Sequence, residues 1–556
     1  MKILIENYSY DADLLKGFLP KRLLTFLNDG KASVDFVGYF NNFADKETVI
    51  ILPKIFLEND KVFANIPPNE FIERKALDVF TKYGKTKSEI DFIFRFSFTF
   101  YLSLREFQKR NPHNIITQKE HTKNIISNLG LSDISELDLI FNLLKFYREN
   151  RDLILFKQKL AEKQKFKKTN WAKTVRKSLP FFQNKIPIYL ESAEKEKRQD
   201  NENELLRIFY DLLFRLKAEF DLKIQIDSNL YQGFQKDFEK KSLRKLKAIR
   251  NKYFADKFKY LLNLLLAYFE KRAFANTKKD KEEFILCRNY NIVFEDMIDK
   301  LLSDENDKIE KLKNQADGKI VDHIFLSESL FPPKDIYYIG DSKYYKDTTA
   351  YSVNTIYKQH TYVKNVIQHN INLLNCNELP LSIRYRDELT EGYNITPNFF
   401  IQGFIEHKDL LNRTDKFRFD DSKSPKLSYQ FKNRLFDRDT LIILDFKVNF
   451  LFVVDSYITN DRKKMKDFKK KASDQIRDFS VKHFNKTYEF YTLQPEEDIK
   501  IFLKSNFKLL LGKIYRDSQD QENLILALAK EFNADNRKLK TEIAKQNIKL
   551  ELFELK

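Results

Sequence analysis

Apolar positions in the first half of the chain change from short strand-like runs to a helical pattern. Residues 34–40 and 48–52 are apolar runs separated by asparagine and aspartate, which indicates two strands and a small β-rich domain over 1–66. Leucines and aromatic residues then recur at helical spacing, most regularly around 205–216. Residues 67–275 are therefore expected to form a large helical, basic region that binds DNA or a partner.

From residue 276 onward, apolar runs of strand length alternate with helical patterns. Strands are expected at 398–405, 440–446, 450–454 and 488–492. Helices are expected at 289–302, 354–374 and 462–481. Strands interleaved with helices favour an α/β sheet domain over 276–500, followed by C-terminal helices over 501–556. The expected fold class is thus α+β multidomain, with a small N-terminal β domain, a large helical middle region and a C-terminal α/β domain.

Within that α/β domain, two strands are expected close together, and acidic residues mark them. The runs 322–326 and 336–345 are strand-like, and two consecutive prolines between them mark the connection because proline cannot donate to a ladder. Side chains alternate along a strand, so Asp341 and Lys343 share one face. Asp322 begins the neighbouring strand and is expected to place a second carboxylate beside Asp341.

Two carboxylates and an ammonium group at one strand end are suited to holding a hard cation and a phosphate together. Magnesium prefers oxygen ligands, commonly one or two carboxylates with water and substrate phosphate. We therefore expect Asp322 and Asp341 to be metal ligands for Mg²⁺, with Mn²⁺ as a substitute. Lys343 is expected to orient the attacking water or to balance developing charge.

This acid-x-base triplet is a common pattern in a chain with 81 acidic and 99 basic residues. Asp221-Leu222-Lys223 and Asp445-Phe446-Lys447 are two others. The second of these lacks a clear acid-opened strand before it and is interpreted as part of a sheet-core strand, with Asp445 at a turn. A solvated strand end at Asp341 remains the alternative to a catalytic site.

Two helices flank the expected strand pair and offer further site residues. The helix over 289–302 is amphipathic and is expected to bring Glu295 near the strands, although a surface acid is the alternative. In the helix over 354–374, Gln359 and Tyr362 lie at i, i+3 on one face. That helix is expected to pack across the strand ends, and ordinary packing is the alternative for both side chains.

The net charge of +18 predicts a polyanionic partner, since Lys and Arg neutralise phosphates, and a generally lysine-rich proteome is the alternative. Two basic segments, 157–177 and 240–252, are the candidate contacts with double-stranded DNA, and a solvated helix face is the alternative for each. Trp171 could stack on bases, but core packing is favoured for it. The candidate nucleic-acid-binding residues are Lys167, Lys168, Trp171, Lys173, Arg176, Lys177, Lys240, Lys241, Arg244 and Lys245.

Several classes of protein do not fit the sequence. Cys287 and Cys376 form no metal-ligand spacing and the seven histidines form none either, which argues against zinc and disulfide frameworks and fits a reducing cytoplasm. Early acidic residues do not suit a signal peptide, and no apolar run is long enough for a bilayer. No GxxxxGK or GxGxxG pattern occurs, so any nucleotide-driven motor is expected on another chain.

At this point the motifs resemble a known family. Val321-Asp322 followed by Asp341-Ser342-Lys343 resembles the PD-(D/E)xK nuclease core, and Glu295 matches the glutamate that this family commonly carries on a preceding helix. More narrowly, the order of motifs resembles McrC-type restriction subunits, especially LlaJI-like restriction endonucleases. The further matching motifs are Val37-Gly38-Tyr39, Ile51-Leu52-Pro53-Lys54, Asn170-Trp171-Ala172-Lys173-Thr174-Val175, Pro187-Ile188-Tyr189 and Lys358-Gln359-His360-Thr361-Tyr362. Val321 replaces the family's proline, and Asp341 stands where many relatives have glutamate.

The resemblance implies a nuclease subunit of a two-component restriction system for phage defence. A separate McrB-like AAA+ GTPase would recognise the DNA site and translocate, contacting the N-terminal domain or the helical region. Glu295 would support the metal site, and Gln359 would orient the helix after Lys343. The alternatives are a non-catalytic nucleic-acid-binding or scaffold subunit of a defence complex, and a PD-(D/E)xK nuclease that acts without a motor.

Overall fold

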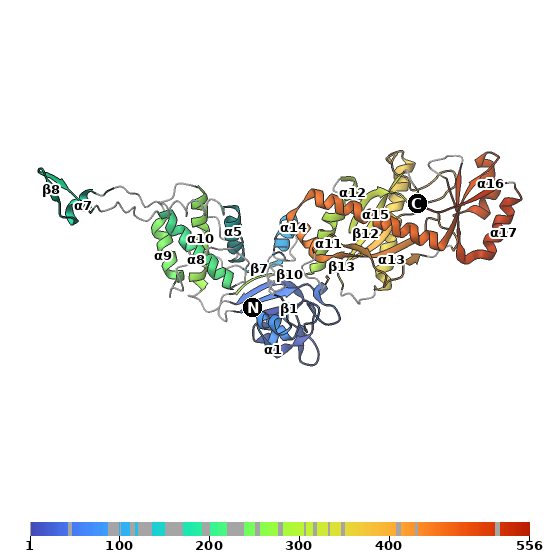
Figure 1. The fold of residues 1–556 in the computed structure, drawn as a ribbon. Coiled ribbons are helices and arrows are strands. Elements are labelled where there is room, and N and C mark those ends of the chain that lie inside the picture. The colour runs from blue at the N-terminus through green and yellow to red at the C-terminus, as the bar shows by residue number, and fades with distance from the viewer. Residues whose placement is uncertain are drawn as a thin grey trace.

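The computed structural model describes most of the chain as a mixed α/β protein with several separate sheets (Figure 1). The described residues are 2–42, 47–86, 99, 102–111, 117–120, 136–150, 169, 171–191, 201–219, 238–250, 256–275, 282–304, 307–314, 320–331, 334–345, 351–406, 413–428, 432–516, 523–546 and 548–556. Among them, no helix combines the length and the apolar character that crossing a membrane requires.

The N-terminal sheet takes its strands from three separate parts of the chain, in the order β1–β6–β5–β10–β7. The bounds are Lys2–Ile5 for β1, Phe36–Asn42 for β5, Glu47–Leu52 for β6, Thr117–Glu120 for β7 and Glu282–Arg288 for β10. The strands expected at 34–40 and 48–52 are therefore present. However, β10 pairs with β5 along its whole length, so the sheet is not complete within 1–66 as expected. The pairing partner lies too far along the chain for local pattern to reveal it.

Short elements pack against this sheet on both faces. They are β2 Tyr10–Asp11, β3 Thr25–Phe26, β4 Lys31–Ser33, α1 Ala12–Lys16, α2 Glu70–Glu73 and α3 Ala76–Lys82. A buried cluster that includes Leu4, Tyr10, Leu15 and Phe40 joins the small β2–β4–β3 sheet to the larger one.

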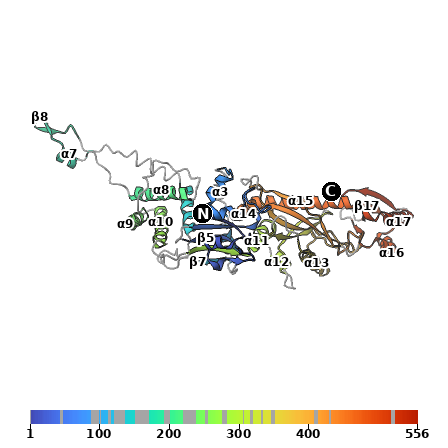
Figure 2. The ribbon, with the colours of Figure 1, turned by 90° about the horizontal axis from the view of Figure 1, so that it is seen from below.

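Four helices of the middle region form a bundle with a core of its own. They are α5 Glu136–Glu149, α8 Asn201–Glu219, α9 Phe238–Ile249 and α10 Asp256–Ala275. Leu143, Phe209, Leu213, Leu265 and Phe269 belong to that core, which the helical leucine pattern predicted. A projection lies beyond the bundle in Figures 1 and 2, made of α7 Trp171–Lys177, β8 Phe181–Gln183 and β9 Ile186–Ile188.

The central sheet has the order β11–β12–β13–β16–β14, with β15 also pairing β16. Its strands are β11 His323–Glu328, β12 Asp335–Lys343, β13 Asn398–Phe404, β14 Phe417–Phe419, β15 Lys426–Ser428 and β16 Leu441–Asn449. Strands β12, β13 and β16 run parallel, whereas β11, β14 and β15 are antiparallel to their neighbours. The strand pair expected from the two acid-marked runs is thus the β11–β12 hairpin.

Helices before and after the hairpin accompany the central sheet. They are α11 Tyr290–Leu302, α12 Asp307–Lys313, α13 Val353–Asn375, α14 Phe450–Thr459 and α15 Arg462–Thr487. The strand expected at 450–454 was wrong, because this run is the start of α14. Asn449 caps that helix by accepting a hydrogen bond from the Leu451 amide, and the apolar run is buried around the helix instead of along a strand.

The C-terminal part is also more β-rich than expected. A four-stranded sheet has the order β18–β19–β17–β20. Its elements are β17 Tyr488–Gln494, α16 Ile499–Leu510, β18 Ile514–Arg516, β19 Leu524–Ala529, α17 Asn533–Ala544 and β20 Lys549–Phe553. The expectation of helices alone over 501–556 was therefore wrong, and β17 joins this sheet instead of the central one. The leucines and alanines of β19 favour a helix locally, but pairing with β17 overrides that preference.

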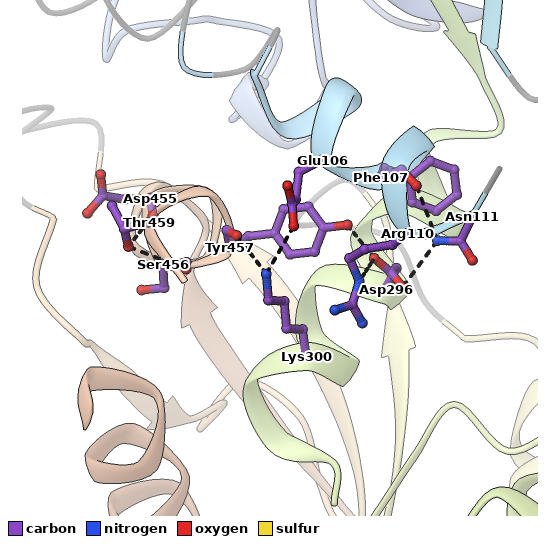
Figure 3. A network of polar contacts seen from close by, with 10 residues as sticks. All are labelled: Glu106, Phe107, Arg110, Asn111, Asp296, Lys300, Asp455, Ser456, Tyr457 and Thr459. Carbon is purple, nitrogen blue, oxygen red and sulfur yellow. Dashed lines mark hydrogen bonds and ion pairs between the residues drawn. The ribbon is translucent and has the colours of Figure 1, made fainter. Parts of the chain in front are cut away.

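A partly buried polar network fixes α11 from the side of the helical segment 102–110 (Figure 3). Lys300 donates to the Tyr457 carbonyl at 3.0 Å and pairs with Glu106 at 3.5 Å. Arg110 pairs with Asp296 at 3.2 Å, and the Tyr457 hydroxyl donates to the same carboxylate. Since Asp296 follows Glu295 directly, the network sets the position of that candidate site residue.

Candidate active site

The β11–β12 hairpin brings Asp322 and Asp341 together. His323 pairs with Gly340, so the next pair outward in the antiparallel register is Asp322 with Asp341. The Asp322 carboxylate accepts a hydrogen bond from the Ser342 amide at 3.1 Å. Burial raises the pKa of Asp322 well above its ordinary value, and the charges of Asp341 and Glu295 raise it further. The paired acids therefore favour a proton or a cation between them.

Glu295 approaches the same acids from α11. Its carboxylate accepts a hydrogen bond from Asn291 at 3.3 Å. Burial raises the pKa of Glu295, and the charge of Asp341 contributes in the same direction. Three carboxylates thus interact electrostatically: Glu295 on α11, Asp322 just before β11, and Asp341 on β12. The sequence predicted that this helix brings Glu295 near the strands.

Lys343 is the cation closest to this acidic group. Its ammonium forms an ion pair with Asp341 and lies 5.0 Å from the centre of the Phe400 ring on the neighbouring strand β13. The side chain is only 13% exposed. The ammonium is consequently held beside the acids, where it can donate to a bound water or phosphate oxygen.

Helix α13 connects to the site through Gln359, which is buried. Its Nε2 donates to Asn398 at 2.7 Å, at the first residue of β13. Its Oε1 is buried and has no hydrogen-bond partner among the residues that the structure describes. Gln359 therefore ties α13 to the sheet, in keeping with an orienting role, and offers one further oxygen at this edge.

Lys358 is a neighbour that the sequence reasoning did not name as a site residue. It is exposed, and its ammonium lies 5.4 Å from the Tyr362 ring centre. A hydrogen bond with Tyr362 raises the pKa of Lys358, and the charges of Asp341 and Asp322 add to this effect. The motif Lys358-Gln359-His360-Thr361-Tyr362 was the only signal that could have indicated it.

The carboxylate oxygens of Asp322 and Asp341 are of the kind that a hard divalent ion prefers. Within the described ranges, no group of three or more His, Cys, Asp or Glu side chains is placed to hold a metal ion, so these acids do not form a complete protein cage. Magnesium does not require such a cage, since one or two carboxylates, water and a substrate phosphate suffice. Burying mutually repelling carboxylates is unfavourable without a compensating positive charge, so the residues present fit a Mg²⁺ or Mn²⁺ ion.

The opposite face of the hairpin carries a buried histidine relay. His323 Nε2 lies 2.6 Å from the Ser342 hydroxyl, and His323 Nδ1 lies 3.3 Å from Asp299 of α11. Ser342 alternates with Asp341 and Lys343 along β12, so this relay fixes the strand between the two site residues. Sequence reasoning missed it, because the contact depends on how α11 packs.

The basic candidates do not belong to this site. Lys167 and Lys168 lie outside the described residues. Arg176 and Lys177 lie with Lys173 on α7, whereas the exposed residues Lys240, Lys241, Arg244 and Lys245 lie on α9. Lys245 pairs with Glu204 of α8 at 3.2 Å. Neither α7 nor α9 lies against the central sheet in either view (Figures 1 and 2).

Trp171 is not a core anchor, although core packing was favoured for it. Its side chain is 62% exposed and contacts Tyr189 edge-on, with ring centres 6.3 Å apart. The indole is therefore available to a partner.

Comparisons with protein-family models, with curated proteins and with solved structures found no match for this chain. The site is therefore described by its own geometry: a hairpin that pairs two aspartates, a helix-borne glutamate and an adjacent lysine.

Proposed function

We propose that the protein is a Mg²⁺-dependent endodeoxyribonuclease with a PD-(D/E)xK core. The observation that carries the proposal is the pairing of Asp322 with Asp341 across a hairpin, beside Glu295 and Lys343. The connection from β12 through α13 to the parallel strand β13 supports this proposal, since Gln359 of α13 donates to Asn398 at the first residue of β13. A net positive charge of +18 suits a polyanionic substrate.

In this proposal, Asp322 and Asp341 hold the divalent ion and Glu295 supports the site from α11. When bound, such an ion lowers the pKa of a coordinated water and stabilises charge on the scissile phosphate. Lys343 orients the attacking water or balances charge that develops on the phosphate. Gln359 keeps α13 in register with β13.

We further propose that this nuclease is a subunit of a McrBC- or LlaJI-like restriction system in the cytoplasm, driven by a separate AAA+ GTPase. Of the 20 large apolar side chains exposed in the described residues, eight lie between Trp171 and Leu190. Such a concentration is characteristic of a protein–protein contact. The projection therefore favours a subunit with a partner over a nuclease that acts alone.

The test is cleavage of supercoiled plasmid with Mg²⁺ or Mn²⁺, with and without a candidate AAA+ GTPase and GTP. Asp341→Asn and Lys343→Gln are compared with wild type and with Glu497→Gln, a matched change at an exposed acid before α16. Loss of cutting in the first two variants alone is expected. Full cutting by Asp341→Asn would reject the site, and absence of cutting by folded wild type under all conditions would favour the scaffold alternative.

A further inference from the structure

A second carboxylate–lysine group repeats the geometry of the candidate active site on the same sheet. Asp445 and Lys447 lie two residues apart on β16, as Asp341 and Lys343 do on β12. Asp420 follows the antiparallel strand β14 and lies opposite Asp445, since Phe419 pairs with Phe446 and the Asp420 amide donates to the Asp445 carbonyl at 2.8 Å. The expected turn at Asp445 was therefore wrong, because this residue is central in a buried strand.

The strand register places both groups on one face. Asp341 pairs with Phe400, and Phe400 pairs with Asp445. In the next row on that face, Lys343 pairs with Gln402 and Gln402 with Lys447. Directly paired residues point to the same side of a sheet, and two strand spacings amount to about 10 Å.

Aromatic rings join the two groups. Tyr351 packs on Phe400 with ring centres 4.7 Å apart. The ammonium groups of Lys343 and Lys426 lie 5.0 Å and 5.9 Å from the centre of that same Phe400 ring. The second group is therefore a direct neighbour of the candidate active site.

The second group has the opposite charge balance. Lys426 pairs with Asp445, while Lys447 and Lys423 lie 3.5 Å and 3.7 Å from Asp420. Three lysines thus face two aspartates, whereas at the candidate active site three acids face Lys343. Burial alone would raise the pKa of Asp420, but the Ser422 hydrogen bond and both lysines hold it below its ordinary value.

The lysines of the second group are ordered before any ligand arrives. Lys423 donates to the Tyr351 hydroxyl at 2.9 Å and to Gln402 at 3.0 Å. The side chains of Lys423, Lys426 and Lys447 are only 11–17% exposed. Exposed Arg418 lies directly opposite Lys447 in the register of β14 with β16. It therefore adds a further positive charge at the edge of the second group. Such fixed cations bind an anion with little loss of side-chain entropy.

We propose that this second group, with Arg418, binds a non-scissile phosphate of the DNA strand whose scissile phosphate lies at Asp322 and Asp341. The inference rests on the nuclease function proposed above and adds a positioning contact for its substrate. With a rise of about 3.4 Å per nucleotide, a separation of about 10 Å corresponds to a few nucleotides along the strand. The contact recognises the phosphate backbone and no particular base.

The test measures binding of the full-length protein to a fluorescein-labelled DNA duplex without divalent metal, over a range of salt concentrations. Arg418→Ala changes an exposed residue, and Lys423→Gln preserves a hydrogen-bonding side chain. Lys426→Gln combined with Asp445→Asn removes an ion pair as a unit and leaves neither charge buried alone. Lys504→Gln, at an exposed position of α16, is the matched control.

Arg418→Ala and Lys423→Gln are each expected to weaken binding about equally for all sequences and to lower the slope of log affinity against log salt by about 1. The double variant loses one positive and one negative charge, so its slope should fall by less. Lys504→Gln should leave the slope unchanged. The proposal would be overturned if the slope is unchanged in Arg418→Ala and also in another variant of the second group that melts like wild type. Metal-dependent cleavage that is abolished by Asp445→Asn but retained by Asp341→Asn would also overturn it, since the second group would then be the metal site.

These outcomes are distinguishable from failure of the nuclease proposal. If plasmid cleavage is absent but the salt slope falls in the Arg418→Ala and Lys423→Gln proteins, the phosphate contact stands without the nuclease. If cleavage depends on Asp341 but the slope does not change, the nuclease stands and the phosphate contact is rejected.

Discussion

The Tyr344 hydroxyl donates a hydrogen bond to the carboxylate of Glu6, which joins the residue after Lys343 to the end of β1 in the N-terminal sheet. Both side chains are buried. The same Glu6 oxygen accepts a hydrogen bond from the Lys54 amide at 3.3 Å, and the Lys54 ammonium lies 4.6 Å from the Tyr344 ring centre. The N-terminal sheet thereby fixes the end of the strand that carries the candidate site.

This contact predicts that Glu6→Gln stabilises the protein at neutral pH. Burial raises the pKa of Glu6, only partly opposed by Tyr344 and Lys54, and Asp35 adds repulsion. A carboxyl whose pKa is higher in the folded state contributes stability below its unfolded pKa, and that contribution is lost as pH rises through the folded value. The substitution should therefore raise the free energy of unfolding by about 1 kcal/mol at pH 8 and less at pH 4.

Urea unfolding at several pH values measures this effect. Glu73→Gln, at an exposed position in α2, is the control for a general change in acid content. A destabilised Glu6→Gln protein at pH 8 would show that the ionised carboxylate is needed for the contact.

Because Asp322 lies close to two other acids, we predict that neutralising it stabilises the metal-free protein but weakens metal binding. Because the charges of Asp341 and Glu295 raise its pKa, Asp322→Asn should stabilise the metal-free protein by about 1 kcal/mol. Mn²⁺ or Mg²⁺ should raise the melting temperature of wild type by selective binding to the folded state. The same ions should have little effect on Asp322→Asn, which thermal melting with and without metal will measure. Equal metal-induced shifts in both proteins would exclude Asp322 as a ligand.

The buried relay predicts a cost for Ser342→Ala. Removing the hydroxyl leaves His323 Nε2 buried without its partner at 2.6 Å, so a loss of about 1–3 kcal/mol is expected in urea unfolding. Burial lowers the pKa of His323, while Asp299 opposes this and Lys313 adds to it. Stability that comes from the neutral imidazole is present above its unfolded pKa and is lost as pH falls through the folded value.

His323→Gln should therefore flatten the acid side of the stability profile. The charges of Asp299 and Lys313, and that of Asp341 on the other face of the hairpin, also act on the imidazole, so the comparison is made at constant ionic strength. An unchanged pH dependence in the folded variant would show that another group controls acid stability.

The backbone at Gly340, next to Asp341, has no room for a larger side chain. A Cβ atom at this position would lie 2.4 Å from Cζ of Phe399, so Gly340→Ala must displace the ring or the strand. Overpacking of this kind typically costs about 1–3 kcal/mol. Cleavage should fall together with stability, and Gly340→Ala combined with Phe399→Leu should restore part of both. If the single variant melts and cleaves like wild type, β12 tolerates movement at this point.

The sequence predicted the hairpin because its signals are local. Short continuous apolar runs define β11 and β12, and consecutive prolines mark the connection. The same local reasoning misassigned the start of α14, since a short apolar run fits a buried helix or a buried strand equally well. Asn449 before that run is a capping residue, and it was the available signal for a helix.

Other features could not be predicted from the local sequence pattern, because they depend on pairing between distant segments. Asp420 becomes the counterpart of Asp445 only through the register of β14 with β16. β10 completes the N-terminal sheet only by pairing with β5. The relay through Asp299 requires the packing of α11 on β11.

The single residue Asn289 separates β10 from α11, with a left-handed backbone angle φ of 53°. The strand belongs to the N-terminal sheet, and the helix carries Glu295. This one-residue joint connects a strand of the N-terminal sheet directly to the helix that carries Glu295, so the backbone itself couples the position of that helix to the sheet.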